Sequence, residues 1–294
     1  MMRYEIDVIT PRNLDEALSI LDKNESGTRI VAGGSDVIVQ LRDGVLKAKR
    51  LLNILSLKEL RFVRKDGKIV HIGSLTTYSD IVHSPITQDH AWPLLEAAEQ
   101  IGAVQLQNTA TIGGNLGNAS PAGDSIPPLY ALDTTVTTRS TSGTRKIPIE
   151  QFFQSYRKID LKPNELIEEV CFKALGTHDR GCYIKLGLRE ANAISIVDVA
   201  VVLREERDAK SFTEARVALG AVAPTIRRAR RCEEALVSGP LTPDVLRRAA
   251  NLVADDVSPI DDIRGSAEYR KEVVVSLTYE ALYQAVYNGE KHRG

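Results

Sequence analysis

The segment best suited to hold a ligand is residues 100–123, which contains no Asp, Glu, Lys, Arg or His although 26% of the chain is charged. From Thr109 to Gly123 it is built of small, neutral residues rich in hydroxyl and amide groups. Such residues expose backbone N–H groups to an anionic or polar ligand, because few Cβ atoms stand in the way. Asp124 or Ser125 then provides the N-cap of a predicted helix with proline in its first turn, and a helix N-terminus attracts negative charge.

Two Gly-Gly pairs stand in similar surroundings, in Ala32-Gly33-Gly34-Ser35-Asp36 and in Thr111-Ile112-Gly113-Gly114-Asn115. A single pair of this kind is most simply a surface loop, whereas two favour a ligand site. Neither pair has the Gly-x-Gly-x-x-Gly spacing of a Rossmann site, and Asn53 stands where that site needs an acidic residue. No Gly-Lys-Ser/Thr occurs, so the phosphate loop of Walker proteins is excluded as well.

Both glycine pairs must be positioned by regular elements, and apolar periodicity predicts them. The first 55 residues are predicted to form a small alternating α/β unit, with helices at 15–21 and 37–41 and strands at 28–32 and 50–54. Residues 56–176 form an α+β segment with two hairpins, at 60–73 and 133–148, a strand at 165–172 and helices near 77–80 and 93–101. Residues 177–294 read as a separate α+β unit, with strands at 181–188, 195–203 and 212–219 and helices at 226–238, 242–255 and 266–288.

Composition narrows the function classes. The formal net charge is −1, so nothing indicates binding to nucleic acid or to an anionic membrane. Three scattered cysteines without a Cys-x-x-Cys pair make a disulfide framework and a zinc or iron–sulfur site improbable, and no two histidines have metal-ligand spacing; we expect no metal. The N-terminus lacks a signal-peptide core and no apolar run is long enough to span a membrane, so we expect a cytoplasmic protein.

The tract 110–129 resembles the FAD-binding medium subunits of molybdenum hydroxylases such as xanthine, carbon monoxide and nicotinate dehydrogenases. The resemblance covers nearly the whole chain, since further segments follow in the order of that family. They are Val31 to Asp36, Phe152-Phe153 with Tyr156-Arg157, Lys162 to Ile167, Tyr183 to Leu186 with Arg189, and Ala218 to Thr225.

The resemblance implies an α+β fold: a two-lobed FAD-binding domain of the PCMH (vanillyl-alcohol-oxidase-like) type, with lobes 1–55 and 56–176. A C-terminal domain, 177–294, would follow, with a three-stranded antiparallel sheet and a helix bundle. FAD would lie extended between the lobes. Related enzymes that reduce aromatic thioesters carry an iron–sulfur insertion in this subunit, and the spacing of the three cysteines shows that the insertion is lacking here.

The resemblance also assigns cofactor contacts to positions of this chain. Arg29 to Asp36 should hold the pyrophosphate and adenosine side, and Thr111, Gly113, Gly114 and Asn115 should line the path to the ribityl chain. Asp124 should bond the flavin side, with Ile101 and Ile167 packed on the cofactor and Lys185 approaching it from the C-terminal domain. The full set is Arg29, Ile30, Val31, Ala32, Gly33, Gly34, Ser35, Asp36, Ile101, Ala110, Thr111, Gly113, Gly114, Asn115, Ala119, Asp124, Ile167 and Lys185.

The residue chemistry constrains these roles. Neither glycine motif contains Arg or Lys, so backbone N–H groups must offset the two phosphate charges. Phosphate would repel the carboxylates of Asp36 and Asp124. The favoured interpretation is that Asp36 is the N-cap of a helix and that Asp124 binds a hydroxyl group of the cofactor. Lys185 is either a cofactor contact or an exposed strand lysine. Arg227, Arg228, Arg230 and Arg231 around Cys232 form either a solvated helix face, which is favoured, or a docking face.

The family role would make this chain the electron-exit subunit, with no catalytic residue of its own. Electrons would reach its FAD from two [2Fe-2S] clusters of a small partner subunit, after a large molybdopterin subunit has oxidised the substrate, and would leave to NAD, quinone, ferredoxin or oxygen. A dimer of heterotrimers would be the expected assembly. Two alternatives stay open: a stand-alone FAD-dependent oxidase or dehydrogenase, and a scaffold subunit that has lost FAD.

Overall fold

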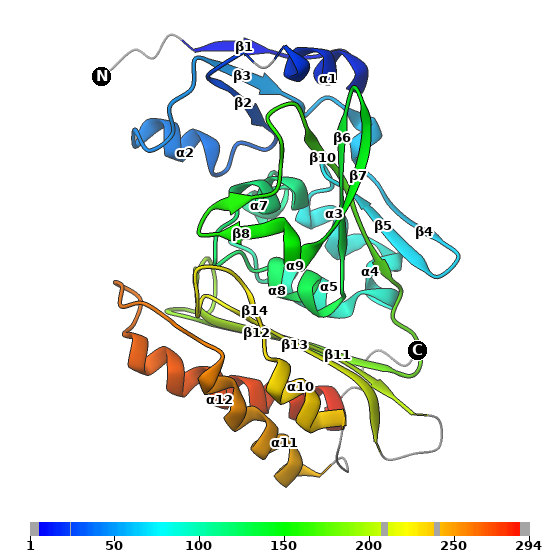
Figure 1. Ribbon diagram of the computed structural model, residues 1–294, viewed down its shortest axis with the longest axis vertical. Helices are drawn as coiled ribbons and strands as arrows, with labels where there is room; N and C mark the ends of the chain where they lie inside the picture. The colour runs from blue at the N-terminus through cyan, green and yellow to red at the C-terminus, as the bar shows by residue number, and fades with distance from the viewer. Residues whose placement is uncertain (1–5, 24, 207–210, 238–241, 289–294) are drawn as a thin grey trace.

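The computed structural model describes residues 6–23, 25–206, 211–237 and 242–288 (Figure 1). Three sheets follow one another along the longest axis of the molecule, from top to bottom in Figure 1, and each of the segments 1–55, 56–176 and 177–294 contains one of them. A two-stranded hairpin, β8 (Phe153–Ser155) and β9 (Lys158–Ile159), is added to the middle segment. In the described part of the chain, no helix has the length and apolar character needed to cross a membrane.

The first sheet is parallel and lies between two helices. Its strands are β1 (Asp7–Ile9), β3 (Arg50–Asn53) and β2 (Thr28–Val31), in that order, with α1 (Leu14–Asp22) and α2 (Val37–Arg42) as crossovers. Leu52 of β3 packs with α1 and Leu51 packs with α2, as alternation along a strand requires. The predicted α/β unit is confirmed, and β1 is an addition to it.

The second sheet is antiparallel, in the order β4 (Val63–Asp66), β5 (Ile69–Gly73), β10 (Leu166–Lys173), β6 (Thr135–Ser140), β7 (Gly143–Pro148). Both predicted hairpins are present, and Gly67 supplies the positive φ (+55°) that the first turn needs. The remaining elements of this segment are η1 (Lys58–Leu60), α3 (Tyr78–His83), α4 (Pro85–His90), α5 (Trp92–Glu99), α6 (Val104–Gln107), α7 (Ile112–Asn118), α8 (Ile126–Ala131) and α9 (Ile149–Phe152).

The third sheet contains the three predicted long strands, β11 (Asp179–Gly187), β12 (Ser195–Glu205) and β13 (Phe212–Gly220), all antiparallel. A fourth strand of two residues, β14 (Arg227–Arg228), pairs with β13, so the helix predicted over 226–238 begins only at Arg230. Its last predicted residue lies outside the described part of the chain. The helices are α10 (Arg230–Val237), α11 (Pro243–Asn251) with η2 (Leu252–Asp255), and α12 (Ala267–Tyr283) with the short π-helix η3 (Gln284–Asn288).

Both faces of the third sheet are covered, which explains the continuous apolar run of β12. Val199, Val201 and Leu203 pack under the C-terminal helices, whereas Ala200 and Val202 join the core of the second segment around α5 and α8. Asp198 has the same parity as Ala200 and Val202. It therefore faces the second segment, as Ala200 and Val202 do.

Candidate functional site

The turn between β2 and α2 offers a row of free backbone donors. Gly34 has φ +74°, a left-handed conformation that favours glycine. The backbone N–H groups of Gly33, Gly34, Ser35 and Asp36 donate to no other group in the described part of the chain. Four neighbouring unpaired donors that precede a helix form a site for an anion without any cationic side chain.

The first glycine motif is held directly against the second. A Cβ on Gly33 would lie 1.7 Å from the carbonyl oxygen of Thr109, so only glycine allows the two backbones to approach this closely. Asn118 joins the motifs again, since its Nδ2 donates to Asp36 Oδ1 (3.0 Å) and its Oδ1 accepts from Gln40 Nε2 (2.8 Å). Asp36 occupies the N-cap position of α2 but makes no side-chain capping bond, contrary to the favoured interpretation; its carboxylate binds Asn118 instead.

The second motif forms the first turns of α7 rather than an open loop. Thr111 is the N-cap and accepts from Gly114 N (3.1 Å), while Gly113 N donates to Ser74 O (2.9 Å). The backbone donors of Ile112, Gly113, Gly114 and Asn115 are thus already paired. What it offers instead is a bare helical face, because Gly114 and Gly117 are exposed and a Cβ on Gly117 would meet no atom within 4 Å.

A chain of hydrogen bonds anchors this helix in the core. Asn115 Oδ1 accepts from Ser125 Oγ (3.0 Å), which in turn is 2.9 Å from the Tyr78 hydroxyl. Tyr78 is fully buried, and burial together with the charges of Asp124 and Asp36 raises the pKa of its phenol. Tyr78 is therefore within electrostatic reach of both aspartates.

Asp124 does not cap α8, contrary to one of the two expectations for that helix. Ser125 occupies the N-cap position, without a side-chain capping bond. Asp124 instead accepts from Lys185 Nζ at Oδ2 (2.6 Å) and from Ser195 Oγ at Oδ1 (2.6 Å). Lys185 also donates to Gln100 O (3.0 Å) and its side chain is only 6% exposed, so it is no solvated strand lysine. Burial raises the pKa of Asp124, and the Lys185 ammonium opposes that shift.

A second buried carboxyl group, that of Asp198, lies beside this pair and was missed by the sequence analysis. Asp198 is fully buried; Oδ2 accepts from the Tyr183 hydroxyl (3.2 Å), and Oδ1 has no hydrogen-bond partner. Burial, with the charge of Asp124 second, raises the pKa of Asp198 to about 8. The available signal was an acidic residue inside the apolar run of a predicted strand, because such a residue is seldom buried without a specific role.

The other predicted cofactor residues fall around these two motifs. Ile101 follows α5 directly after Gln100, and Ile167 is buried on β10; both belong to the core of the second segment. Ala119 ends α7 in a left-handed conformation (φ +50°), and Ala110 O accepts from Tyr78 N. Arg29, Ile30, Val31, Ala32 and Ser35 lie along β2 and its turn. The guanidinium of Arg29 is exposed, and within the described chain it donates only to Thr28 O.

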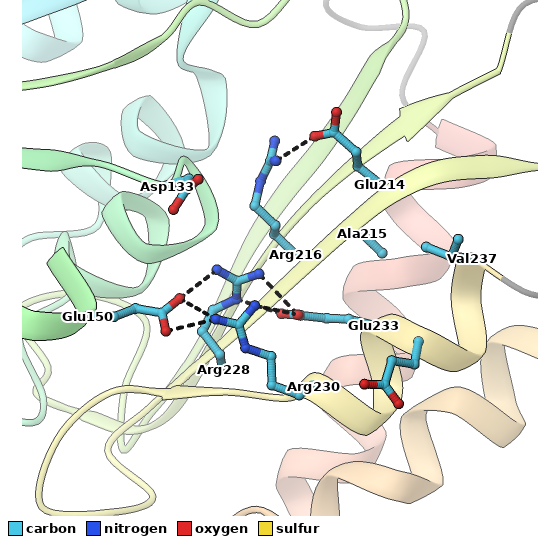
Figure 2. A pocket seen from close by; sticks show the side chains of 10 residues that line it. Asp133, Glu150, Glu214, Ala215, Arg216, Arg228, Arg230, Glu233 and Val237 are labelled. Carbon is cyan, nitrogen blue, oxygen red and sulfur yellow. Dashed lines mark hydrogen bonds and ion pairs between the residues drawn. The ribbon is translucent and has the colours of Figure 1, made fainter. Parts of the chain in front are cut away.

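The arginine cluster divides: Arg228 and Arg230 form a joint between domains, whereas Arg227 and Arg231 are exposed, as the favoured solvated face predicts. Arg228 lies on β14 with a side chain only 7% exposed, and binds Glu233 of α10 and Glu150 of α9. Arg230 reaches the same two carboxylates (Figure 2). A groove of about 640 Å³ runs along this joint, and none of the predicted cofactor residues lines it.

Comparison with known proteins identifies the family. Residues 4–172 match the model of the FAD binding domain in molybdopterin dehydrogenase, and residues 183–285 match that of the CO dehydrogenase flavoprotein C-terminal domain. The chain belongs to the FAD-binding medium subunits of the molybdenum hydroxylases. It is the flavoprotein subunit of an oxidoreductase complex.

Individual relatives of this flavoprotein subunit align over nearly their whole length. The nicotinate dehydrogenase FAD-subunit of Eubacterium barkeri is 31% identical, over 92% of each chain. The putative xanthine dehydrogenase FAD-binding subunit of Escherichia coli is 32% identical, over 93% of each. A solved structure of carbon monoxide dehydrogenase from Hydrogenophaga pseudoflava superposes with a TM-score of 0.93 at 28% identity, over 97% of this chain and 98% of that one.

Proposed function

We propose that FAD binds where the two glycine motifs meet, with its diphosphate on the turn 33–36. The observation that carries this is the row of N–H groups from Gly33 to Asp36, directly before α2, that have no acceptor among the described residues. A dinucleotide diphosphate is an anion, and this turn supplies several neutral donors to it without a cationic side chain. Arg29 to Ala32 would contact the adenosine side from β2.

The bare face of α7 would accommodate the middle of the cofactor. Gly114 and Gly117 lie one helical turn apart and present no side chain, so a ligand could lie directly on the helix backbone. Thr111, Gly113 and Asn115 would fix this surface through their bonds to Gly114, Ser74 and Ser125. The Lys185–Asp124 pair, with Ile101 beside it, would lie at the flavin end, and Ile167 and Ala119 would support the helix from below.

In this role the bound FAD supplies the redox chemistry, taking up electrons and passing them to an acceptor. The residues of this chain bind it, orient it and set the charge around it. We infer that the electrons come from a small subunit with two [2Fe-2S] clusters, fed by a large molybdopterin subunit, in a dimer of heterotrimers. In support, relatives that align with this chain over more than nine-tenths of their length are named as medium chains or FAD-subunits of dehydrogenases.

The two alternatives are disfavoured by particular features. A scaffold that had lost FAD would have no use for four unpaired donors or for a helix face bare of side chains. For a stand-alone oxidase, the described chain would need a substrate pocket beside the flavin end. Two grooves of the described chain, one along the interdomain ion pairs and one beside β4 and β7, contain none of the residues proposed for the flavin end.

The cofactor site is tested with Gly117→Leu. Leucine suits a helix, and apart from the backbone of α7 itself its Cβ would meet no atom of the described residues within 4 Å, so the fold should persist while the ligand surface is blocked. Purified variant should retain little FAD, measured by absorbance after denaturation, with an unchanged far-UV circular dichroism spectrum. Gly176→Leu, at another open glycine far from both motifs in the sequence, is the matched control. Full FAD content in Gly117→Leu would contradict the site.

The electron-exit role is tested separately, on the native complex. Native mass spectrometry should find this chain with two further polypeptides, and stopped-flow mixing with NADH should show whether NAD is the acceptor by the rate of flavin bleaching. A monomeric holoprotein that oxidises an organic substrate on its own would favour the stand-alone alternative.

A further inference from the structure

Three potential metal ligands meet on one face of the second sheet, outside the cofactor region. His71 on β5 is the direct cross-strand neighbour of Cys171 on β10, and Glu169 projects from the same face two residues earlier. One ring nitrogen of His71, one carboxylate oxygen of Glu169 and the sulfur of Cys171 all lie within 4.8 Å of one another. Among the described residues, no other His, Cys, Asp or Glu side chains form such a group of three.

We propose that His71, Glu169 and Cys171 bind a zinc ion. Imidazole nitrogen, thiolate sulfur and carboxylate oxygen are the donors that Zn²⁺ uses in proteins, and three protein ligands leave one position for water. The mixed donor set argues against Mg²⁺ and Ca²⁺, which take oxygen ligands. The sequence analysis expected no metal because the ligands come from strands 98 residues apart, with no local spacing to reveal them.

The distances fit one ion with small side-chain adjustments. His71 Nδ1 lies 3.1 Å from Glu169 Oε1 and 3.2 Å from Oε2. Two nitrogen or oxygen ligands of a tetrahedral zinc lie about 3.3 Å apart, given bond lengths of about 2.0–2.1 Å. The Cys171 sulfur lies within 4.8 Å of the His71 nitrogen and the Glu169 oxygen, and a rotation about χ1 of Cys171 can bring it nearer to both. The backbone need not move, because β5 and β10 pair in register from Glu169 to Lys173.

Burial at this position suits an ion, which would have to compete with two cations that already act on the ligands, Arg64 on Glu169 and Lys146 on Cys171. The side chains of His71 and Glu169 are 19% and 13% exposed, so the site is sheltered yet open to an ion from solvent. Glu169 already attracts a positive charge, since Arg64 Nη2 lies 3.4 Å from its Oε2. That contact is long and the Arg64 side chain is 57% exposed, so the arginine can leave at small cost. On binding, the Cys171 thiol would release its proton to solvent and become the thiolate ligand.

The test is a zinc titration of the intact holoprotein after removal of metal with a chelator. Isothermal calorimetry should find one Zn²⁺ per chain. Cys171→Ser, His71→Asn and Glu169→Gln should each weaken binding by more than about 100-fold, the upper limit for losing a mere supporting group. Asparagine and glutamine retain hydrogen bonds between these positions, so their effect isolates metal ligation. His83→Asn, at an exposed helix position, and Cys232→Ser, in the C-terminal core, should bind zinc as the wild type does.

A second measurement keeps the proposal testable if a variant folds poorly. Co²⁺ added to the wild type should give the intense visible bands of a four-coordinate site, at longer wavelengths than flavin absorption. The weak bands of six-coordinate aqueous Co²⁺, or zinc affinity that is equal in wild type and Cys171→Ser, would overturn the site. FAD content is measured in the same samples, so failure of the zinc site is separable from failure of the flavin site.

Discussion

At the scale of single residues, two buried carboxyl groups lie close to one ammonium group. Asp124 is paired with Lys185, whereas Asp198 is fully buried beside them with one oxygen unpartnered. Burial, and after it the negative charge of Asp124, raises the pKa of Asp198 to about 8, so the group holds its proton at neutral pH. The cluster is then electrically balanced, with one carboxylate against one ammonium group.

Replacing Asp198 tests this balance. The folded protein holds the Asp198 proton up to a pKa of about 8, whereas the unfolded chain loses it near pH 4. The protonated Asp198 therefore contributes its full share to the free energy of unfolding below the pKa of the unfolded chain. Between about pH 4 and pH 8 that contribution falls by roughly 1.4 kcal/mol per pH unit. In urea denaturation from pH 5 to 9, Asp198→Asn should flatten this decline and gain a few kcal/mol over the wild type at about pH 8.

The matched control for that variant is Asp66→Asn, which removes a carboxylate from an exposed hairpin. It should keep the pH dependence of the wild type. A decline in Asp198→Asn as steep as in the wild type would show that this carboxyl is already ionised in the folded protein.

Individual residues also show where sequence reasoning stops. The glycine pairs 33–34 and 113–114 were found from composition, because their types alone restrict what they can do. The pairing of Lys185 with Asp124 could not be found, since 61 residues separate them and only the docking of the third sheet brings them together. Asp36 and Asp124 were interpreted as possible caps for the same reason: the sequence shows the neighbouring helix, but not the distant side chain that binds the carboxylate instead.

At the scale of elements, the glycines around α7 divide into two kinds. Gly33 and Gly113 allow backbone segments to pack closely, against Thr109 and Ser74 respectively. Gly114 and Gly117 leave the exposed face of α7 without side chains. The sequence predicts that small residues are needed here, but it cannot assign each glycine to packing or to ligand access without the third dimension.

Alanine substitutions separate the two kinds. Gly33→Ala places a Cβ within 1.7 Å of the Thr109 carbonyl oxygen and should destabilise the protein by about 3 kcal/mol or more, because backbone has to move. Gly117→Ala should stabilise it by about 1 kcal/mol through helix propensity, since the added methyl group meets nothing. Guanidinium denaturation of the FAD-free proteins measures both effects, and equal stabilities would contradict this division.

Most elements followed from periodicity and turn chemistry, as both hairpins and the three long C-terminal strands show. β14 did not, because two arginines before a helix have the composition of a helix start. Their strand conformation depends on pairing with Ala218 and Leu219 of β13, which is a tertiary effect. The helical interpretation of Ile226 to Ala229 was wrong for that reason.

At the scale of the whole molecule, the third sheet is joined to the second segment by apolar packing and by ion pairs. Glu150 of α9 binds Arg228 and Arg230, and Glu233 of α10 binds the same arginines from the other side (Figure 2). Glu233 also accepts from Val217 N (2.8 Å), so it links α10, β13 and β14. Within this cluster of described residues, it is Glu150 that carries the contact across to the FAD-binding segment.

The residues of this joint should differ in how much they contribute to the free energy of unfolding. Glu150→Gln affects a side chain that is 36% exposed, and should cost at most about 1 kcal/mol. Arg228→Met leaves Glu233, whose side chain is 7% exposed, without its closest cation and should cost about 3–5 kcal/mol. Thermal unfolding followed by calorimetry compares the two variants, and a larger loss for Glu150→Gln would contradict this ranking.

The hydrogen bonds from Asn118 to Asp36 and Gln40, together with the Gly33–Thr109 approach, have a practical consequence for protein engineering. They cross from the first 55 residues into the uncharged tract 100–123, to Thr109 and to Asn118 at the end of α7. In a hybrid assembled from two relatives with its junction near residue 55, the residues on the two sides of these contacts would come from different parents and would no longer match. A junction between β10 and β11, near Gly176, would leave both sides of that seam inherited from one parent.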